Sequence, residues 1–295
     1  MIIYIDEHRR SFGVEPICRT LAVAPSSYYA ARVRPASARS IRDEALKSEI
    51  ARIHREHFSV YGVRKAWRVL RREGIAIGRD QAGRLMRSLG LVGATRTRRT
   101  KTTVPATLAE RPADLVERVF SAIAPNRLWV ADLTYVWTRA GFVYTAFVVD
   151  VFARAIVGWR VAANLRTDLA LDALEMALFA RGDLLPELVH HSDRGVQYLA
   201  IKYTERLAVA EAVGSVGSRG DSYDNALAET VNGLYKAELI NRRGPWRSVD
   251  EVELATAEWV HFWNTRRLHS ACGDVPPAEF EAAYHQRLQA ATEAA

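Results

Sequence analysis

The chain has 295 residues, of which 49% are hydrophobic and 25% are charged, a composition typical of a globular protein of about two domains. No apolar run approaches the roughly 18 residues that span a bilayer, and charges at residues 6–10 interrupt any secretory signal. The sequence therefore predicts a cytoplasmic protein without a membrane partner. Its two cysteines exclude a disulfide framework and a cysteine-rich zinc site.

The net charge of +7 is divided unevenly along the chain. Residues 1–111 carry 23 Lys and Arg against 10 Asp and Glu, whereas residues 112–295 carry 18 against 24. A basic front half joined to an acidic back half suggests a module that binds a polyanion, attached to one that uses carboxylates. Charge alone leaves a solvated basic surface as an equal alternative.

The basic front half is predicted to be helical. Residues 1–34 are expected to form an N-terminal helical segment, with short helices at Val14–Leu21 and Pro25–Ala31. Residues 40–95 contain three amphipathic stretches, the first beginning near Asp43, with glycines at the turns between them. Three short helices of this kind predict an all-α helix-turn-helix DNA-binding module.

The third helix of this module carries the candidate DNA contacts. Its outward positions hold side chains that hydrogen-bond base edges and phosphates, namely Arg79, Gln81, Arg84 and Arg87. A basic linker over residues 96–122 follows, in which Arg98 and Arg99 are expected to lie along a phosphate backbone. A plain three-helix bundle followed by a soluble linker is the alternative interpretation.

The second half, residues 123–285, has a different pattern. Three runs rich in Val, Trp, Tyr and Phe predict an antiparallel meander, and helices then alternate with two short strands. The predicted strands are Leu128–Thr138, Phe142–Asp150, Ala155–Ala162, Leu188–His191 and Val213–Val216, and the predicted helices are Asp168–Arg181, Tyr198–Ala210, Asp224–Leu239 and Val249–Arg267. This order predicts an α/β fold of the ribonuclease H-like type, a mixed sheet flanked by helices.

Three acidic residues stand out against this predicted sheet. Asp132 lies within the first strand among apolar neighbours, Asp193 follows the fourth strand, and Glu229 lies on a later helix. A charged residue inside a strand is costly unless it is paired or binds a cation. Lys236 is seven residues beyond Glu229, so the two side chains are expected to share a helix face that points away from the core.

Carboxylates gathered in this way repel one another unless a cation neutralises them. Mg²⁺ and Mn²⁺ prefer oxygen ligands, and two such ions about 4 Å apart can act on a phosphodiester. The sequence therefore predicts a site for Mg²⁺ or Mn²⁺, with two ions, at Asp132, Asp193 and Glu229. Any one of these acids alone could equally be a turn cap or a surface residue.

Taken in order, the motifs resemble the catalytic protein of the IS-three family of bacterial insertion sequences, whose catalytic domain is similar to retroviral integrase. The matching segments are Leu128–Tyr135, Val149–Arg154, Val157–Trp159, His191–Tyr198, Gly220–Ala226, Trp263–Ser270 and Pro276–Phe280, together with Glu229 and Lys236. The likeness runs from about residue 61 to residue 281.

The resemblance implies a DNA transposase whose metal-binding triad is Asp132, Asp193 and Glu229, with Lys236 touching DNA near the cleaved phosphate. It further implies that a 3′-hydroxyl is exposed at each end of the insertion sequence and then attacks another phosphodiester. The implied partners are the terminal repeats, target DNA and further copies of the chain. A protein encoded in an upstream frame, separate or fused by frameshifting, is also implied.

Several polar residues have a structural interpretation beside a functional one. Asp150 is expected to serve a turn, and Asp224 to cap the helix of Glu229. His191 adjoins Asp193, but a strand-borne histidine more often completes a core. Arg267 follows an aromatic stripe that predicts core packing, although its guanidinium could also hold a phosphate.

Two rival functions remain open on the sequence. A simple metal-dependent nuclease of the same fold would share the triad but would cut without joining. A DNA-binding regulator, or a decayed protein that only binds DNA ends, would need no metal site at all.

Overall fold

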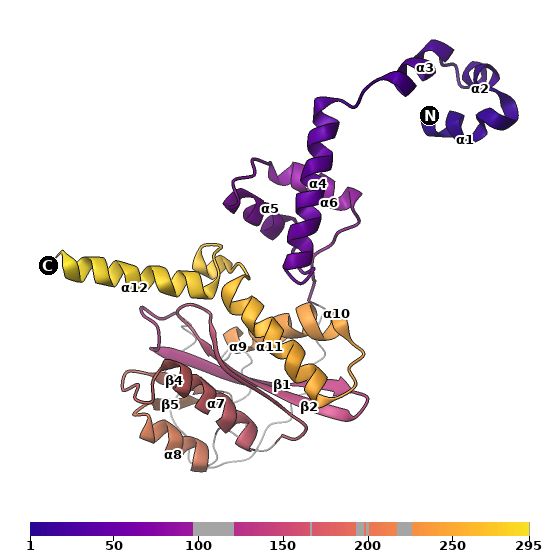
Figure 1. Cartoon of the computed structure of the whole chain (residues 1–295). Helices are drawn as coiled ribbons and strands as arrows, with labels where there is room; N and C mark the ends of the chain where they lie inside the picture. The colour runs from indigo at the N-terminus through magenta and orange to yellow at the C-terminus, as the bar shows by residue number, and fades with distance from the viewer. Residues whose placement is uncertain (97–120, 166, 193–197, 199–200, 217–225, 295) are drawn as a thin grey trace.

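The computed structural model describes residues 1–96, 121–165, 167–192, 198, 201–216 and 226–294. Asp193, Arg98 and Arg99 lie outside the described residues. The described chain forms a group of N-terminal helices, a three-helix module and an α/β domain (Figure 1). None of the described helices has the length and apolarity needed to cross a membrane.

The N-terminal group contains α1 (Ile2–Phe12), α2 (Val14–Thr20) and α3 (Pro25–Val33). Helices α2 and α3 agree with the prediction to within two residues, whereas α1 was not predicted. Ile5 is its one buried residue. The group has a small core of its own and stands apart from the other two parts (Figure 1).

The three-helix module consists of α4 (Ala38–Glu56), α5 (Val63–Arg72) and α6 (Arg79–Ser88). Helix α4 begins five residues before the predicted position. The reason is local, because the Ser37 hydroxyl caps the helix by accepting a hydrogen bond from the Ser40 amide at 3.1 Å. The prediction of three helices is confirmed.

The α/β domain has a five-stranded sheet with the order β3-β2-β1-β4-β5. Its strands are β1 (Leu128–Thr138), β2 (Gly141–Asp150), β3 (Ile156–Ala162), β4 (Val189–Ser192) and β5 (Val213–Val216). Strands β1, β2 and β3 pair antiparallel, whereas β4 and β5 run parallel to β1. The predicted meander and the ribonuclease H-like strand order are confirmed.

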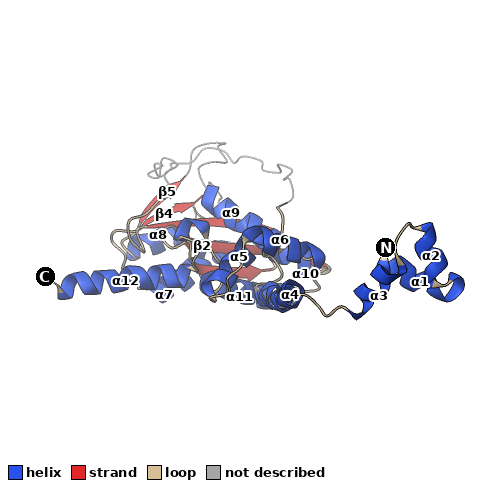
Figure 2. Cartoon of the chain, turned by 90° about the horizontal axis from the view of Figure 1, so that it is seen from above, coloured by secondary structure: helices blue, strands red, loops and turns tan. Residues whose placement is uncertain are grey.

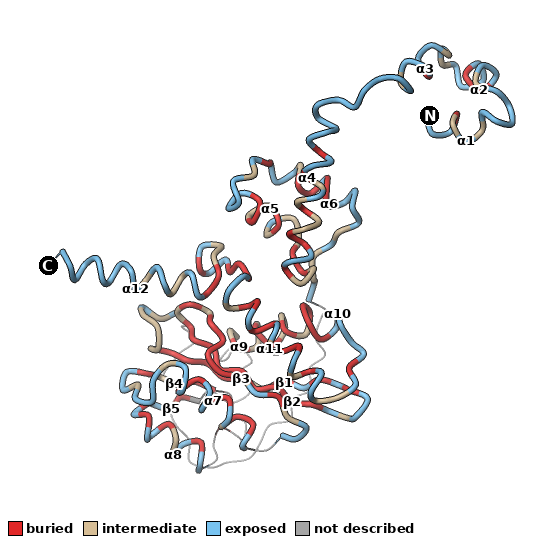
Figure 3. The backbone as a smooth tube through the Cα atoms, viewed as in Figure 1, coloured by how far each residue is buried: buried red, intermediate tan, exposed pale blue. Residues whose placement is uncertain are grey.

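Helices cover both faces of this sheet, and Figure 3 shows the strands as its buried centre. Helices α7 (Thr167–Arg181) and α8 (Ile201–Val209) pack on the face that contains Trp129 and Val148. Gly158 allows the close approach of β3 to α7, since a Cβ there would lie 2.0 Å from the carbonyl oxygen of Ala173.

The opposite face is covered by three short consecutive helices and by one longer helix, and Figure 2 labels α9, α10 and α11 among them. The consecutive helices are α9 (Ala226–Tyr235), a π-helix η1 (Lys236–Ile240) and α10 (Asn241–Arg243). The longer helix is α11 (Val249–Thr265), followed by the 3-10 turn η2 (Ser270–Cys272) and α12 (Pro277–Glu293). The prediction gave no bounds for α12, in which Phe280 and Tyr284 pack against the ring of Phe152.

The three-helix module packs directly on the α/β domain. The rings of Phe58 and Phe262 stack with centroids 4.6 Å apart, and the Tyr61 hydroxyl accepts a hydrogen bond from the Leu268 amide at 2.8 Å. Buried residues of both parts belong to one apolar cluster. The module and the sheet are therefore joined by packing as well as by the chain.

Candidate active site

Asp132 lies on β1 next to the end of the described pairing between β1 and β4. Strand β4 pairs with β1 only as far as Ala131, which lies opposite Ser192, the last residue of β4. The half-buried Asp132 carboxylate accepts hydrogen bonds from the Leu133 amide and from Asn232 Nδ2, each at 2.8 Å. Its orientation is therefore held by its own strand and by α9.

Glu229 lies on α9, one helical turn before Asn232. Val231 and Tyr235 of this helix are buried in the apolar core beneath it, and Asn232 beside them reaches Asp132 on β1. Asn232 is 1% exposed, and its link to Asp132 joins positions 100 residues apart in the chain. The sequence indicated the shared face of α9 but not this contact, which brings the turn of Glu229 to the strand of Asp132.

These residues suit a hard divalent cation. The Asp132 and Glu229 carboxylates supply the oxygen ligands that Mg²⁺ prefers. The buried Asn232 Oδ1 has no hydrogen-bond partner within the described part of the chain, so it can accept one from metal-bound water. No group of three metal-ligating side chains occurs among the described residues, and Asp193 follows Ser192 outside them. The complete triad stays a prediction.

Lys236 lies where α9 changes into η1. The wider turn of a π-helix alters the face that each later residue presents, and such turns often occur at functional sites. The Lys236 ammonium lies 4.2 Å from the centre of the Tyr135 ring on β1. Lys236 is therefore on the strand side of the helix, as is Asn232, but its proposed DNA contact is untested.

Arg267 forms a buried ion pair with Glu238. Its guanidinium donates to Glu238 Oε1 at 2.7 Å and to Oε2 at 2.9 Å, and the two side chains are each 6% exposed. The pair attaches η1 to the segment after α11. The aromatic stripe beside it, Trp259, Phe262 and Trp263, packs in the core as predicted.

Asp150 serves a turn, as predicted. It is fully buried and accepts hydrogen bonds from the amides of Asn126 and Phe152 at 2.7 and 2.8 Å. Burial raises the pKa of its carboxyl above the usual value. These hydrogen bonds connect the end of β2 with the segment before β1 and with the turn that follows β2.

The two histidines before Asp193 complete the core. His191 lies 3.0 Å from the Ser215 hydroxyl, and His190 lies 3.1 Å from the Tyr203 hydroxyl. Burial lowers the pKa of His190 to about 4, so the ring stays neutral at physiological pH. Asp224, the predicted helix cap, lies outside the described residues.

The third helix of the front module places its polar residues in two groups. Gln81 and Arg84 donate to the two carboxylate oxygens of Asp43 on α4, at 2.9 and 2.7 Å. These hydrogen bonds hold the pKa of Asp43 below its usual value. Arg79 and Arg87 are exposed, apart from contacts within their own helix. The sequence could not distinguish the two groups, because periodicity identifies a face and not its neighbours.

Comparisons with known proteins agree with this arrangement. Residues 41–99 match the family described as "HTH-like domain", and residues 122–222 and 214–277 match two families described as "Integrase core domain". Among solved structures, the HTLV-2 integrase catalytic core in complex with magnesium is 17% identical, with a TM-score of 0.43. The match covers 54% of this chain and 98% of that one.

Two relatives match over nearly their whole length. A Mycobacterium tuberculosis protein named for insertion sequence element IS986/IS6110 is 54% identical over 273 residues, which cover 91% of this chain and 98% of that protein. The transposase for insertion sequence element IS629 of Shigella sonnei is 49% identical over 293 residues, covering 98% of each. The chain belongs to the IS-three family of insertion-sequence transposases, with an integrase core behind a helix-turn-helix-like domain.

Proposed function

We propose that this transposase cuts DNA at the ends of its insertion sequence and joins the exposed 3′ ends to another phosphodiester, using Asp132, Asp193 and Glu229 as metal ligands. The observation that carries the proposal is the Asn232 bridge, which ties the helix of Glu229 to the carboxylate of Asp132. A site preorganised in this way avoids reorganisation during the reaction.

Asp132 and Glu229, with Asp193, would hold two Mg²⁺ or Mn²⁺ ions. When bound, such ions neutralise charge on the phosphodiester and activate the attacking oxygen. The chain itself orients the ligands. Asn232 Nδ2 donates to Oδ2 of Asp132 and the Leu133 amide donates to Oδ1, so that the orientation of the carboxylate is fixed. Lys236, on the same helical stretch as Glu229, would contact a nearby DNA phosphate.

The helix-turn-helix module would hold the terminal repeat through Arg79 and Arg87, with Arg98 and Arg99 along the phosphate backbone. Gln81 and Arg84 could contact bases only after their hydrogen bonds to Asp43 break. Breaking these bonds would lower the affinity for DNA. Because two DNA ends must be held together for joining, we infer a homo-oligomer on DNA. An upstream-frame protein, separate or fused, would supply a further DNA-binding part.

An assay for the joining of cut DNA ends to target DNA tests the proposal, because a transposase joins the ends and a simple nuclease does not. The full chain, alone and with the upstream-frame protein, is incubated with Mg²⁺, a target plasmid and labelled DNA carrying the terminal repeat. We expect cleavage that exposes a 3′-hydroxyl, and labelled product covalently joined to the target. Cleavage without joining in both mixtures would favour a nuclease, and DNA binding without either reaction would favour a regulator.

A further inference from the structure

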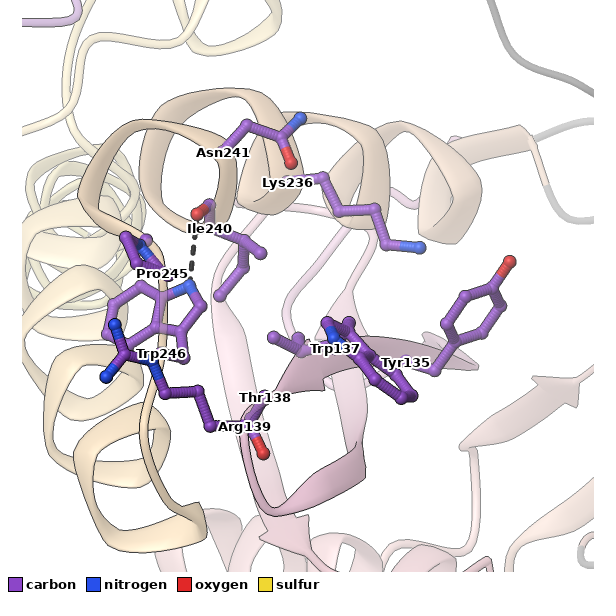
Figure 4. A pocket seen from close by; sticks show the side chains of 11 residues that line it. Tyr135, Trp137, Thr138, Arg139, Lys236, Ile240, Asn241, Pro245 and Trp246 are labelled. Carbon is purple, nitrogen blue, oxygen red and sulfur yellow. Dashed lines mark hydrogen bonds between the residues drawn. The ribbon is translucent and has the colours of Figure 1, made fainter.

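Strand β1 continues well beyond its neighbour β4. It has 11 residues, of which only Leu128–Ala131 pair with β4. Within the part of the chain that the structure describes, the next β-bridge on this side of β1 after Ala131 joins Thr138 to Trp246. The end of β1 from Tyr135 onwards forms one side of a cavity of about 440 Å³ whose other side is η1 and the segment after it (Figure 4).

Aromatic side chains at this end of the β1–β2 hairpin are exposed. Trp137 is 66% exposed, and Tyr135 and Phe142 are 47% and 48% exposed. The Phe142 ring meets the other two edge-to-face, with centroids 4.8 Å from Trp137 and 5.6 Å from Tyr135. Rings that brace one another in this way form a fixed apolar platform, and an exposed apolar cluster of this kind usually marks a binding surface.

The cavity is positively charged. Lys236 lies over the Tyr135 ring, and the exposed Arg139 is also among the lining residues. Its described lining contains no Asp or Glu. Flat rings beside cations without carboxylates suit a ligand that is both planar and anionic, which describes the bases and phosphates of a nucleic acid strand.

We propose that this cavity binds an unpaired stretch of the DNA strand that leaves the active site, with a base stacked on Trp137. Bases within a duplex already stack on one another, so a stacking platform selects bases that are unpaired. Asp132 and Trp137 are five residues apart on one strand, or about 16 Å. This odd spacing puts the two side chains on opposite faces of β1. A single DNA strand that reaches both must cross the edge of β1, where the Lys236 ammonium lies over the Tyr135 ring. The inference rests on the proposed function, because it assumes that the reacting phosphate lies near Asp132.

The test compares two DNA ligands with the full chain in the absence of divalent metal, so that no cleavage occurs. One ligand is a blunt duplex, and the other is the same duplex with an unpaired four-nucleotide extension. Fluorescence anisotropy measures the Kd of each. We expect Trp137→Ala to weaken binding of the extended duplex about tenfold and to leave the blunt duplex unchanged, whereas Trp137→Phe should keep most of the affinity.

Phe179→Ala is the matched control, because Phe179 is 92% exposed on α7, away from the cavity. Thermal unfolding of each variant confirms that it folds. Equal losses on both ligands, or no loss on either, would overturn the inference. A change in oligomeric state without a change in Kd would overturn it too, and would assign the platform to contact between copies of the chain. None of these outcomes affects the joining test, which can fail independently.

Discussion

Replacement of Glu229 by Gln should lower the rate of DNA strand cleavage by a factor of about 10³ or more, while DNA binding is unchanged. The amide keeps the size of the side chain but removes the charge that a divalent ion requires. Metal ions supply several kcal/mol of transition-state stabilisation in reactions of this class, and about 4 kcal/mol corresponds to such a factor. Single-turnover cleavage of terminal-repeat DNA measures the effect.

The control for lost charge is Glu205→Gln, on the exposed surface of α8. It should cleave at the wild-type rate. Because Glu229 is only half-buried, its replacement should leave the thermal unfolding midpoint close to that of the wild type. A cleavage rate of the Glu229 variant within a few-fold of the rate of the Glu205 variant would show that Glu229 is not a catalytic residue.

Arg267→Met should destabilise the protein by about 3–5 kcal/mol, because it leaves the Glu238 carboxylate buried without its partner. The pair is 6% exposed on each side and connects η1 with the segment after α11. Since η1 begins at Lys236, we also expect the loss to disturb the segment that carries this lysine. Urea denaturation gives the free energy of unfolding.

An exposed ion pair provides the comparison. Lys47 and Glu44 are neighbours on α4 at 2.8 Å, and Lys47→Met should cost no more than about 1 kcal/mol. Replacing Arg267 and Glu238 together by Met and Leu should recover most of the lost stability, since no buried charge then remains. If the Arg267→Met variant had the same free energy of unfolding as the Lys47→Met variant, the expected contribution of the buried ion pair to stability would be wrong.

The sequence predicts those parts of the fold that depend on local patterns. The bounds of β1 and β5 agree with the prediction because alternating or continuous apolar runs between turn residues mark strands directly. The three helices of the front module were likewise visible from their apolar faces. Helices α1 and α12 each bury a single residue, and the prediction gave bounds for neither.

Contacts between distant residues could not be predicted in this way. Asn232 binds Asp132 across 100 residues, and Arg267 pairs with Glu238 across 29. Periodicity placed Lys236 on the face of Glu229 but could not show what that face meets. The π-helix at Lys236 was also invisible, because its wider turn is produced by packing and not by a residue type that marks it. The sequence could therefore name candidate site residues, but not the contacts that hold them.

Under the proposed function, Asp132, Asp193 and Glu229 bind the same metal ions. This shared coordination is tested most directly by changing each of the three residues in turn to Cys and measuring strand joining with Mg²⁺ and with Mn²⁺. Mg²⁺ is a hard ion that binds thiolate poorly, whereas Mn²⁺ accepts sulfur more readily. We predict that all three variants are inactive with Mg²⁺ and partly active with Mn²⁺. Joining at the wild-type rate with Mg²⁺ by any of them would contradict its assignment as a ligand.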